Sequence, residues 1–254
     1  MRVRVTLNQK GDGEGIRLGL NYKEHLQALI YSLMDVKISK WLHDSGFIYN
    51  KRKYKLFTFS GMINRYNDFD YDKKEFIYNG GEVSFLIDSC VSELMYQVVH
   101  GLTNVKGGVV LLGGDEFFIK EVVYVVGREL SGERIRINAI EPIEVHRTDE
   151  KGYTHYFNPS DEYFSRYINN NLRKKWMILN KVDECPYNID IEPVNFNKCK
   201  ERVQTFKGTV IKGWTGHFVC KGDKELIEVA LGCGMGSSNS KGYGIIEIVE
   251  RRGI

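Results

Sequence analysis

His43 lies in the segment WLHDSGF, and four basic residues follow it shortly afterwards: Lys51, Arg52, Lys53 and Lys55. An imidazole titrates near neutral pH, so it can take up and return a proton during a reaction. Fixed cations nearby can hold a phosphate and stabilise the charge that develops on it. This combination is what cleavage of a phosphodiester requires. A histidine at a helix end, followed by a basic strand, is the alternative interpretation.

Tyr31 lies within an apolar run that predicts a helix, where most tyrosines are core residues with a satisfied hydroxyl. His25 occupies the same run and is a weaker candidate base. The six histidines and five cysteines form no H-x-x-x-H, H-E-x-x-H or C-x-x-C pattern, so we expect no metal and no cofactor. A nuclease without a metal would act on RNA, because the 2′-hydroxyl group can serve as the internal nucleophile.

The segment GCGMGSSNSKGYG, residues 232–244, contains five glycines and three serines. Such backbone can approach other backbone closely and adopt positive φ, while the hydroxyl groups and Lys241 can meet phosphates. A helix-like run precedes it and the strand-like IIEIVE follows, the reverse of the dinucleotide-binding order. A P-loop is excluded because Lys241 precedes Gly242. A flexible connection to an edge strand is the alternative.

Hydrophobic periodicity divides the first half of the chain into strands and helices. Residues 2–7 alternate as in a half-buried strand, and residues 22–34 carry an apolar stripe at helical spacing. Further strands are predicted at 56–63, 74–79, 82–88, 109–112 and 117–126, and a second helix at 89–102. The order is β-α-β-β-α-β with an extra hairpin, which is a ferredoxin-like unit.

The second half repeats this order. Residues 134–147 are strand-rich, and a helix is predicted from Pro159, with Asp161 and Glu162 in its first turn, to about Asn180. Strands near 189–196, 202–211 and 216–220 and a short helix at 223–231 follow. We therefore predict an α+β protein of two tandem ferredoxin-like (RRM-like) domains, residues 1–128 and 129–254, with the boundary near 124–134. Two such units create a cleft, and such sheets are common RNA platforms.

Length and charge bound the class of protein. At 254 residues, of which 42% are hydrophobic, the chain is long enough for two domains with substantial cores. The net charge of +3 does not by itself indicate a nucleic-acid partner, but residues 1–60 carry a net charge of +6 and residues 166–181 hold five basic groups and no acid. Local basic stripes fit phosphate binding by one face, although they also fit solvated surface.

The cysteines and the N-terminal residues indicate the compartment. An odd number of cysteines suggests reduced thiols, and the charged, alternating N-terminal residues are unlike a secretory signal. No apolar run approaches the roughly 18 residues that a membrane helix needs. We expect a cytoplasmic location and no membrane partner.

Several segments together resemble one known family. They are HLQALIYSLM (25–34), LHDSG (42–46), KLFTFS (55–60), YFNPSDEYF (156–164) and the glycine-rich segment followed by YGIIEI. The chain resembles the CRISPR-associated endoribonucleases of the RAMP superfamily, which process precursor CRISPR RNA. The resemblance covers nearly the whole length. The glycine-rich segment alone is typical of the superfamily, including members that only bind RNA.

The resemblance implies metal-independent cleavage within each CRISPR repeat, leaving a 5′-hydroxyl and a 2′,3′-cyclic phosphate. His43 would be general base or acid, Tyr31 its partner in proton transfer, and Lys55 the stabiliser of phosphate charge. Repeat RNA is the implied partner; a CRISPR effector complex and a homodimer are left open. The residues expected to bind RNA are Lys51, Arg52, Lys53, Arg173, Lys174, Lys175, Gly232, Gly234, Gly236, Ser237, Ser238 and Lys241.

Two other hypotheses stay open at this point. A non-catalytic RNA-binding subunit of the same superfamily would hold guide RNA in an effector complex and would be unaffected by loss of His43. An unrelated ferredoxin-like metabolic protein would use the glycine-rich segment to bind a small anion, and would show no RNA affinity that falls with salt.

Overall fold

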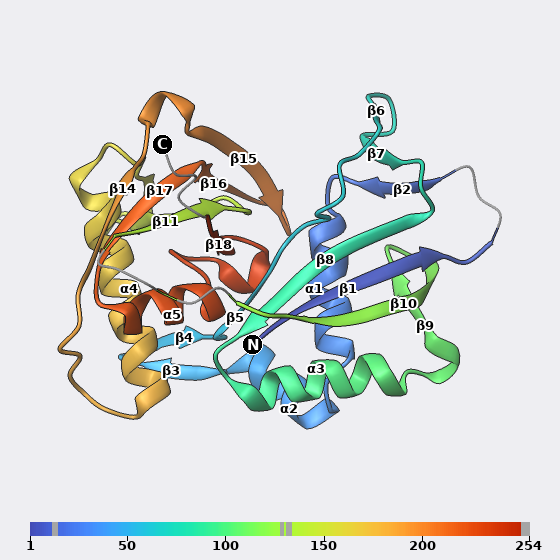
Figure 1. Cartoon of the computed structure of the whole chain (residues 1–254), viewed down its shortest axis with the longest axis horizontal. Coiled ribbons are helices and arrows are strands. Elements are labelled where there is room, and N and C mark those ends of the chain that lie inside the picture. Colours follow the sequence, from blue (N-terminus) through green and yellow to red (C-terminus); the bar gives the residue numbers. More distant parts are fainter. Residues whose placement is uncertain (12–14, 128–129, 131–133, 250–254) are drawn as a thin grey trace.

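A computed structural model describes residues 1–11, 15–127, 130 and 134–249. The fold is mixed α+β, with one main sheet in each half of the chain (Figure 1). The predicted boundary between residues 128 and 129 lies outside the described ranges.

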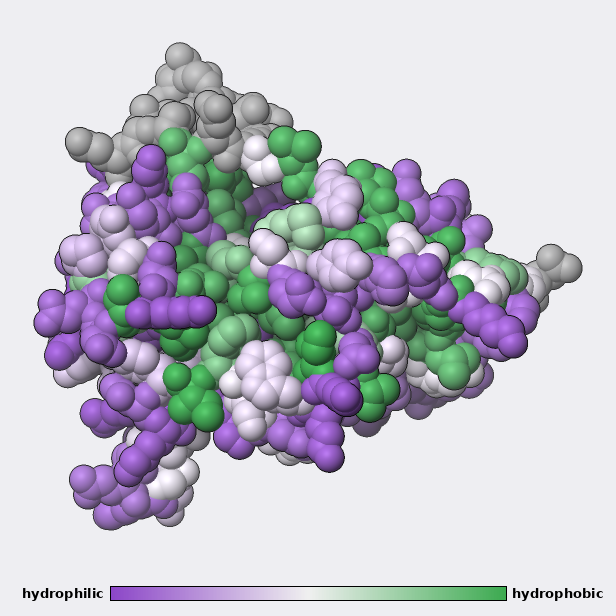
Figure 2. All heavy atoms as spheres, turned by 90° about the horizontal axis from the view of Figure 1, so that it is seen from below, coloured by the Kyte–Doolittle hydropathy of each residue, from purple (hydrophilic) through white to green (hydrophobic). Residues whose placement is uncertain are grey.

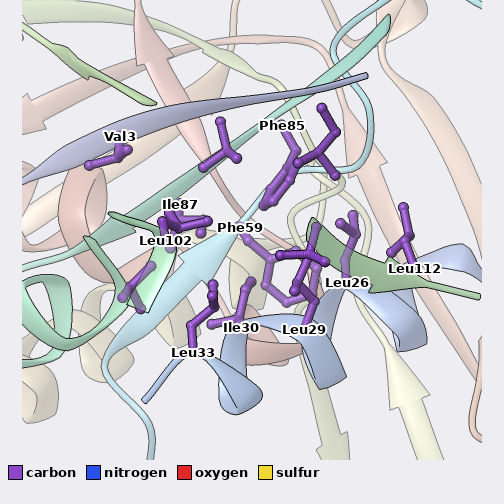
Figure 3. Packing of buried hydrophobic residues seen from close by; sticks show 14 of the residues in the cluster. Val3, Leu26, Leu29, Ile30, Leu33, Phe59, Phe85, Ile87, Leu102 and Leu112 are labelled. Carbon is purple, nitrogen blue, oxygen red and sulfur yellow. The ribbon is translucent and has the colours of Figure 1, made fainter. Parts of the chain in front are cut away.

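The main sheet of the first half is five-stranded and antiparallel, in the order β5-β8-β1-β10-β9. Its strands are β1 (Arg2–Gln9), β5 (Phe57–Phe59), β8 (Glu82–Ser89), β9 (Val109–Leu112) and β10 (Asp115–Val125). Helices α1 (Tyr22–Ser32) and α3 (Ser92–Asn104) pack against it. Leu26 and Ile30 of α1, and the C-cap residue Leu33, point toward Phe59 and Phe85 in the core of this half (Figure 3). The predicted helix over 22–34 is thus confirmed, ending two residues earlier.

A second helix that the sequence analysis missed, α2 (Val36–Asp44), follows α1 after a short turn. The Asp35 carboxylate accepts hydrogen bonds from the backbone N–H groups of Lys37 and Ile38, which is a typical N-cap. His43 therefore lies in the last turn of α2, and not at the exit of the first helix.

The main sheet of the second half has four antiparallel strands in the order β14-β17-β11-β18. These are β11 (Arg134–Ala139), β14 (Ile189–Pro193), β17 (His217–Gly222) and β18 (Ile246–Ile248), packed with α4 (Glu162–Asn180) and α5 (Lys224–Cys233). The predicted helix start at Pro159 is wrong. Asp161 is the N-cap residue and Glu162 begins the helix, while Pro159 lies in the preceding turn.

The strand predicted over 202–211 is instead a hairpin of β15 (Lys200–Phe206) and β16 (Thr209–Thr215). Lys207 and Gly208 form its turn with φ of 47° and 77°, as a tight two-residue hairpin connection requires. The remaining elements are β2 (Ile16–Gly19), β6 (Asp68–Asp70), β7 (Glu75–Tyr78), β12 (His146–Thr148), β13 (Thr154–Tyr156) and the 3₁₀ turns η1 (Lys106–Gly108), η2 (Phe196–Lys198) and η3 (Asn239–Lys241).

Each half of the chain sends a hairpin onto the other (Figure 1). The hairpin of β3 (Phe47–Tyr49) and β4 (Arg52–Tyr54) packs against α4, where the Tyr49 hydroxyl lies 3.8 Å from Met177 Sδ. In return, the β15–β16 hairpin reaches α1, where Lys207 N donates to Glu24 Oε1 at 2.5 Å. These contacts fix the two halves relative to each other.

The face of the molecule seen in Figure 2 carries hydrophilic residues around its outline and hydrophobic residues interspersed across its middle. Among the described residues, no helix combines the length and the apolar composition that crossing a membrane would take.

Candidate active site

The structure brings Tyr31 of α1 and His43 of α2 into contact. Their ring centroids lie 5.7 Å apart at an interplanar angle of 77°, and the Tyr31 ring also meets Phe57 edge-on at 5.8 Å. Both residues line a surface cavity of about 600 Å³, together with Lys40 and Lys207. Two residues that are distant in sequence and able to transfer protons thus face the same space.

The neighbours of the two rings set their hydrogen bonding. His43 is exposed and its Nδ1 lies 2.9 Å from Asp44 Oδ1, and this hydrogen bond holds the pKa of Asp44 below its usual range. Because a carboxylate accepts, Nδ1 is the donor and Nε2 is left to exchange a proton. Burial raises the pKa of the Tyr31 hydroxyl to about 12, so this group keeps its proton at neutral pH.

Lys55 is hydrogen bonded to the backbone of α2. Its ammonium donates to the carbonyl oxygens of Leu42 and His43, the latter at 2.7 Å, and Lys53 Nζ donates to Asp44 O at 2.6 Å. Burial, and then the Lys53 ammonium, lower the pKa of Lys55. Two lysines therefore satisfy the last carbonyls of the helix that carries His43, at the end where a cation is favoured by the helix dipole.

A basic groove runs between the β3–β4 hairpin, α4 and the glycine-rich segment. It consists of two cavities, of about 270 and 340 Å³, which share Arg52, Tyr54, Asn171 and Ser237 in their walls. Of the residues predicted to bind RNA, the following line it: Arg52, Lys53, Lys174, Lys175, Gly236, Ser237, Ser238 and Lys241. Burial, and then the Arg52 guanidinium, lower the pKa of Lys174, as expected where like charges gather.

The groove leads toward the Tyr31–His43 cavity. Gln27, which lines that cavity, donates from Nε2 to Ser240 O in the wall of the groove at 2.5 Å. The ammonium groups of Lys207 in the cavity and Lys241 in the groove each lie 5.8 Å from the centroid of the Phe206 ring. A continuous path of basic groups therefore connects the two regions.

Lys175 lines the groove but is almost entirely buried in its wall. It is 3% exposed, and its ammonium donates to Gly234 O and Asn239 Oδ1 at 2.7 Å, with longer contacts to the carbonyls of Cys233 and Gly236. Burial lowers its pKa to about 8. This lysine therefore holds the glycine-rich segment from beneath, and its direct contact with RNA stays a prediction.

Arg173 and Lys51 were also predicted to bind RNA, but neither lines the two cavities of the groove. The Arg173 guanidinium donates to the carbonyls of Cys185 and Tyr187 and to Asn188 Oδ1, so it fastens the segment that follows α4. Lys51 occupies the exposed turn between β3 and β4 with a φ of 66°. Arg173 is thus engaged within the protein, whereas Lys51 stays open to solvent beside the groove residue Arg52.

The glycines of the segment 232–244 serve close packing. A Cβ at Gly232 would lie 2.4 Å from Cys90 Sγ, and one at Gly236, where φ is +74°, would lie 2.4 Å from Glu144 O. Gly234 is buried as well and has a φ of +78°. The segment is thus held tightly between the two halves, which does not fit the flexible-connection alternative, and only its serines and Lys241 are left partly exposed.

Sequence reasoning missed Lys40 and Lys207. Lys40 precedes His43 by one helical turn, so the α2 helix places both on one face. The Lys207-Gly208 pair was a hairpin-turn signal, but only the folded structure shows that the turn reaches α1. Within the described ranges, no group of three or more His, Cys, Asp or Glu side chains is arranged to hold a metal.

Two sequence models of one family match consecutive parts of the chain. "CRISPR-associated protein Cas6, N-terminal" matches residues 17–123 and "CRISPR associated protein Cas6, C-terminal" matches residues 126–248. The chain belongs to the Cas6 family. The predicted resemblance to CRISPR-associated endoribonucleases is therefore confirmed.

Curated Cas6 relatives match over almost their whole length. CRISPR-associated endoribonuclease Cas6 1 of Methanocaldococcus jannaschii is 26% identical, with 98% of this chain and 93% of the relative covered. CRISPR-associated endoribonuclease Cas6 of Pyrococcus furiosus is 23% identical, with 98% and 90% covered.

Solved structures share the fold. One described as "An RAMP protein binding different RNA substrates" has a TM-score of 0.81 at 21% identity, with 98% of this chain and 100% of the other covered. A Cas6-related protein from Pyrococcus furiosus has a TM-score of 0.80 at 21% identity, with 99% of each chain covered. A Cas6 product complex has a TM-score of 0.70 at 14% identity, with 98% and 99% covered.

Proposed function

We propose that this Cas6 protein cleaves CRISPR repeat RNA in precursor transcripts without a metal, giving 5′-hydroxyl and 2′,3′-cyclic phosphate ends. The observation that carries the proposal is the contact between the Tyr31 and His43 rings at the end of the basic groove. The groove would hold the RNA backbone, and the cavity would receive the phosphate that is attacked.

The hydrogen bond of His43 and the raised pKa of Tyr31 support a division of roles. His43 Nε2 takes the proton of the 2′-hydroxyl as it attacks phosphorus, since Nδ1 is engaged by Asp44. The Tyr31 hydroxyl keeps its proton at neutral pH and donates a hydrogen bond or a proton to the oxygen that leaves. The bond to the 5′-oxygen breaks as the bond from the 2′-oxygen forms.

The cations divide into two groups in this proposal. Lys40 and Lys207 line the cavity and would stabilise the charge on the phosphate in the transition state. Lys55, for which that role was predicted, would act mainly by holding the backbone of α2 and so the position of His43. Lys51, Arg52, Lys53, Lys174 and Lys241 would bind the RNA backbone.

We also propose that each half is a ferredoxin-like domain. The sheet orders β5-β8-β1-β10 and β14-β17-β11-β18 both support this, because each follows a β-α-β-β-α-β order along the chain. The two family models adjoin between residues 123 and 126, which supports a boundary near 124–134. A CRISPR effector complex and a second copy of the chain stay predicted partners.

The test is cleavage of a repeat RNA from the host's own CRISPR array in EDTA, beside the same RNA with one 2′-deoxy nucleotide upstream of the cut. The proposal expects cleavage of the first RNA, and binding without cleavage of the second. Binding of both with cleavage of neither would instead indicate a non-catalytic RNA-binding subunit. Cleavage of the 2′-deoxy RNA would refute attack by the 2′-hydroxyl.

A further inference from the structure

One end of the basic groove contains an acidic group. The cavity of about 270 Å³ is lined by Arg52 and Lys174, yet also by Glu144, which is only 1% exposed. A carboxylate repels the phosphates that the surrounding cations attract. Binding of the RNA backbone alone therefore does not explain why Glu144 lies in this wall.

Two buried acceptors in this wall have no hydrogen-bond donor. Glu144 Oε2 and Asn171 Oδ1 are two of the four buried side-chain oxygens or nitrogens without a partner among the described residues, and both residues line this cavity. Leaving a buried acceptor unsatisfied is costly, and more so when it carries charge. A ligand that donates hydrogen bonds would remove that cost.

The position of Glu144 is fixed by its neighbours. Its Oε1 is hydrogen bonded to His146 Nδ1, an interaction that raises the pKa of His146. Its backbone oxygen accepts from Ser237 N at 2.8 Å, close to Gly236. The free oxygen Oε2 is therefore held in place before any ligand arrives.

Two aromatic side chains also contribute to the wall of the cavity. Tyr54 and Tyr167 line it, and the Tyr167 ring is stacked on Phe157 with centroids 5.3 Å apart. Aromatic rings beside polar groups suit a nucleobase that has been separated from its neighbours in single-stranded RNA. A phosphate would use neither the rings nor a carboxylate acceptor, and a ribose hydroxyl group that donates to the carboxylate would leave the rings unused.

We propose that this cavity binds one base of single-stranded RNA, and that Glu144 selects a base with an exocyclic amine over uracil. The amine of cytosine, adenine or guanine donates to Glu144 Oε2, whereas uracil presents carbonyl oxygens on either side of its single N–H. This inference rests on the proposed RNA binding and adds a specificity residue to it.

The test compares the affinity of the full chain for short oligocytidylate and oligouridylate by fluorescence anisotropy at fixed salt. These polymers differ mainly in the amine. The wild-type protein should bind oligocytidylate about tenfold more tightly, as one hydrogen bond to a buried charged acceptor predicts. Glu144→Gln should reduce the preference to near unity, because its amide can donate to the uracil carbonyl.

Asp149→Asn is the matched control. Asp149 also binds a histidine, with Oδ2 lying 3.0 Å from His155 Nε2, but it does not line this cavity. The Asp149→Asn variant should prefer oligocytidylate to the same degree as the wild type. An oligomer of N4,N4-dimethylcytidine, which has lost both amine protons, should bind wild-type protein as weakly as oligouridylate. The comparison with N4,N4-dimethylcytidine uses wild-type protein, so it tests the inference even if Glu144→Gln does not fold.

Equal affinities of the wild type for the two polymers, or a preference that survives in Glu144→Gln, would overturn the inference while leaving RNA binding intact. Binding of neither polymer, and of no repeat RNA, would overturn the proposed function together with this inference.

Discussion

Gly236→Ala tests whether the glycine-rich segment must approach other backbone closely. Gly236 has a φ of +74°, which costs an alanine about 1–2 kcal/mol. The new Cβ would lie 2.4 Å from Glu144 O, a backbone atom that already accepts from Ser237 N at 2.8 Å and cannot turn away. Overpacking of this kind adds about 1–3 kcal/mol, so we expect a total loss of about 2–5 kcal/mol.

Gly152→Ala separates the cost of positive φ from the cost of overpacking. Gly152 has a φ of +85° but no atom within 4 Å of an added Cβ, so only the backbone term of about 1–2 kcal/mol applies. For a protein of this size each kcal/mol lowers Tm by about 2–4 °C. Gly236→Ala should therefore unfold about 2–12 °C below Gly152→Ala in thermal scans.

The same pair of variants connects packing to function. Moving Gly236 displaces Ser237 and Glu144 in the wall of the basic groove. We expect Gly236→Ala to weaken binding of single-stranded RNA while Gly152→Ala leaves it unchanged. Equal Tm values and equal RNA affinities for the two variants would refute the argument that close approach at residue 236 shapes the groove.

Two further predictions concern the rings in the cavity. His43→Ala should leave RNA affinity nearly unchanged and lower the single-turnover cleavage rate by roughly 10²–10⁴-fold; an unchanged rate would remove His43 from the mechanism. Tyr31→Phe should also slow cleavage without loss of affinity. Because burial raises the pKa of Tyr31 to about 12, the wild-type rate should not fall as pH passes through 10, and a fall that is absent in Tyr31→Phe would contradict the assigned protonation.

Local patterns predicted the elements that hold the site. The apolar stripe of α1 and the alternation of β1 are confirmed because both elements bury one face against a core. Residue type alone indicated that the glycines of the segment can adopt positive φ, and Gly234, Gly236, Gly242 and Gly244 do so. The close contacts that require glycine could not be predicted, because the atoms that a Cβ would strike, such as Glu144 O and Cys90 Sγ, come from distant parts of the chain.

The basic residues show where sequence reasoning stops. Arg173, Lys174 and Lys175 are consecutive on α4, so they point in different directions around the helix axis. Lys174 lines the groove, Lys175 is buried against the glycine-rich segment, and Arg173 is hydrogen bonded to the segment that follows α4. A cluster of charge in the sequence predicts a basic region, but only packing decides which members face solvent.

Lys207 provides the last prediction, because it joins the two halves at the cavity of Tyr31 and His43. The turn that carries it is anchored by the hydrogen bond from its backbone N–H to Glu24, which brings a cation from the second half into the cavity of Tyr31 and His43. Removing a cation that meets developing phosphate charge should cost roughly 10²- to 10³-fold in cleavage. Affinity should change little, because the groove supplies most of the backbone contacts.

Lys200→Ala is the control, since it removes the same charge from the opposite end of the same hairpin. At saturating repeat RNA, Lys207→Ala should cleave slowly and Lys200→Ala at the wild-type rate. Equal rates for the two would mean that the hairpin contributes only general charge. A selective loss in Lys207→Ala would mean that cleavage requires both halves, because the first supplies the proton-transfer pair and the second supplies the cation that faces it.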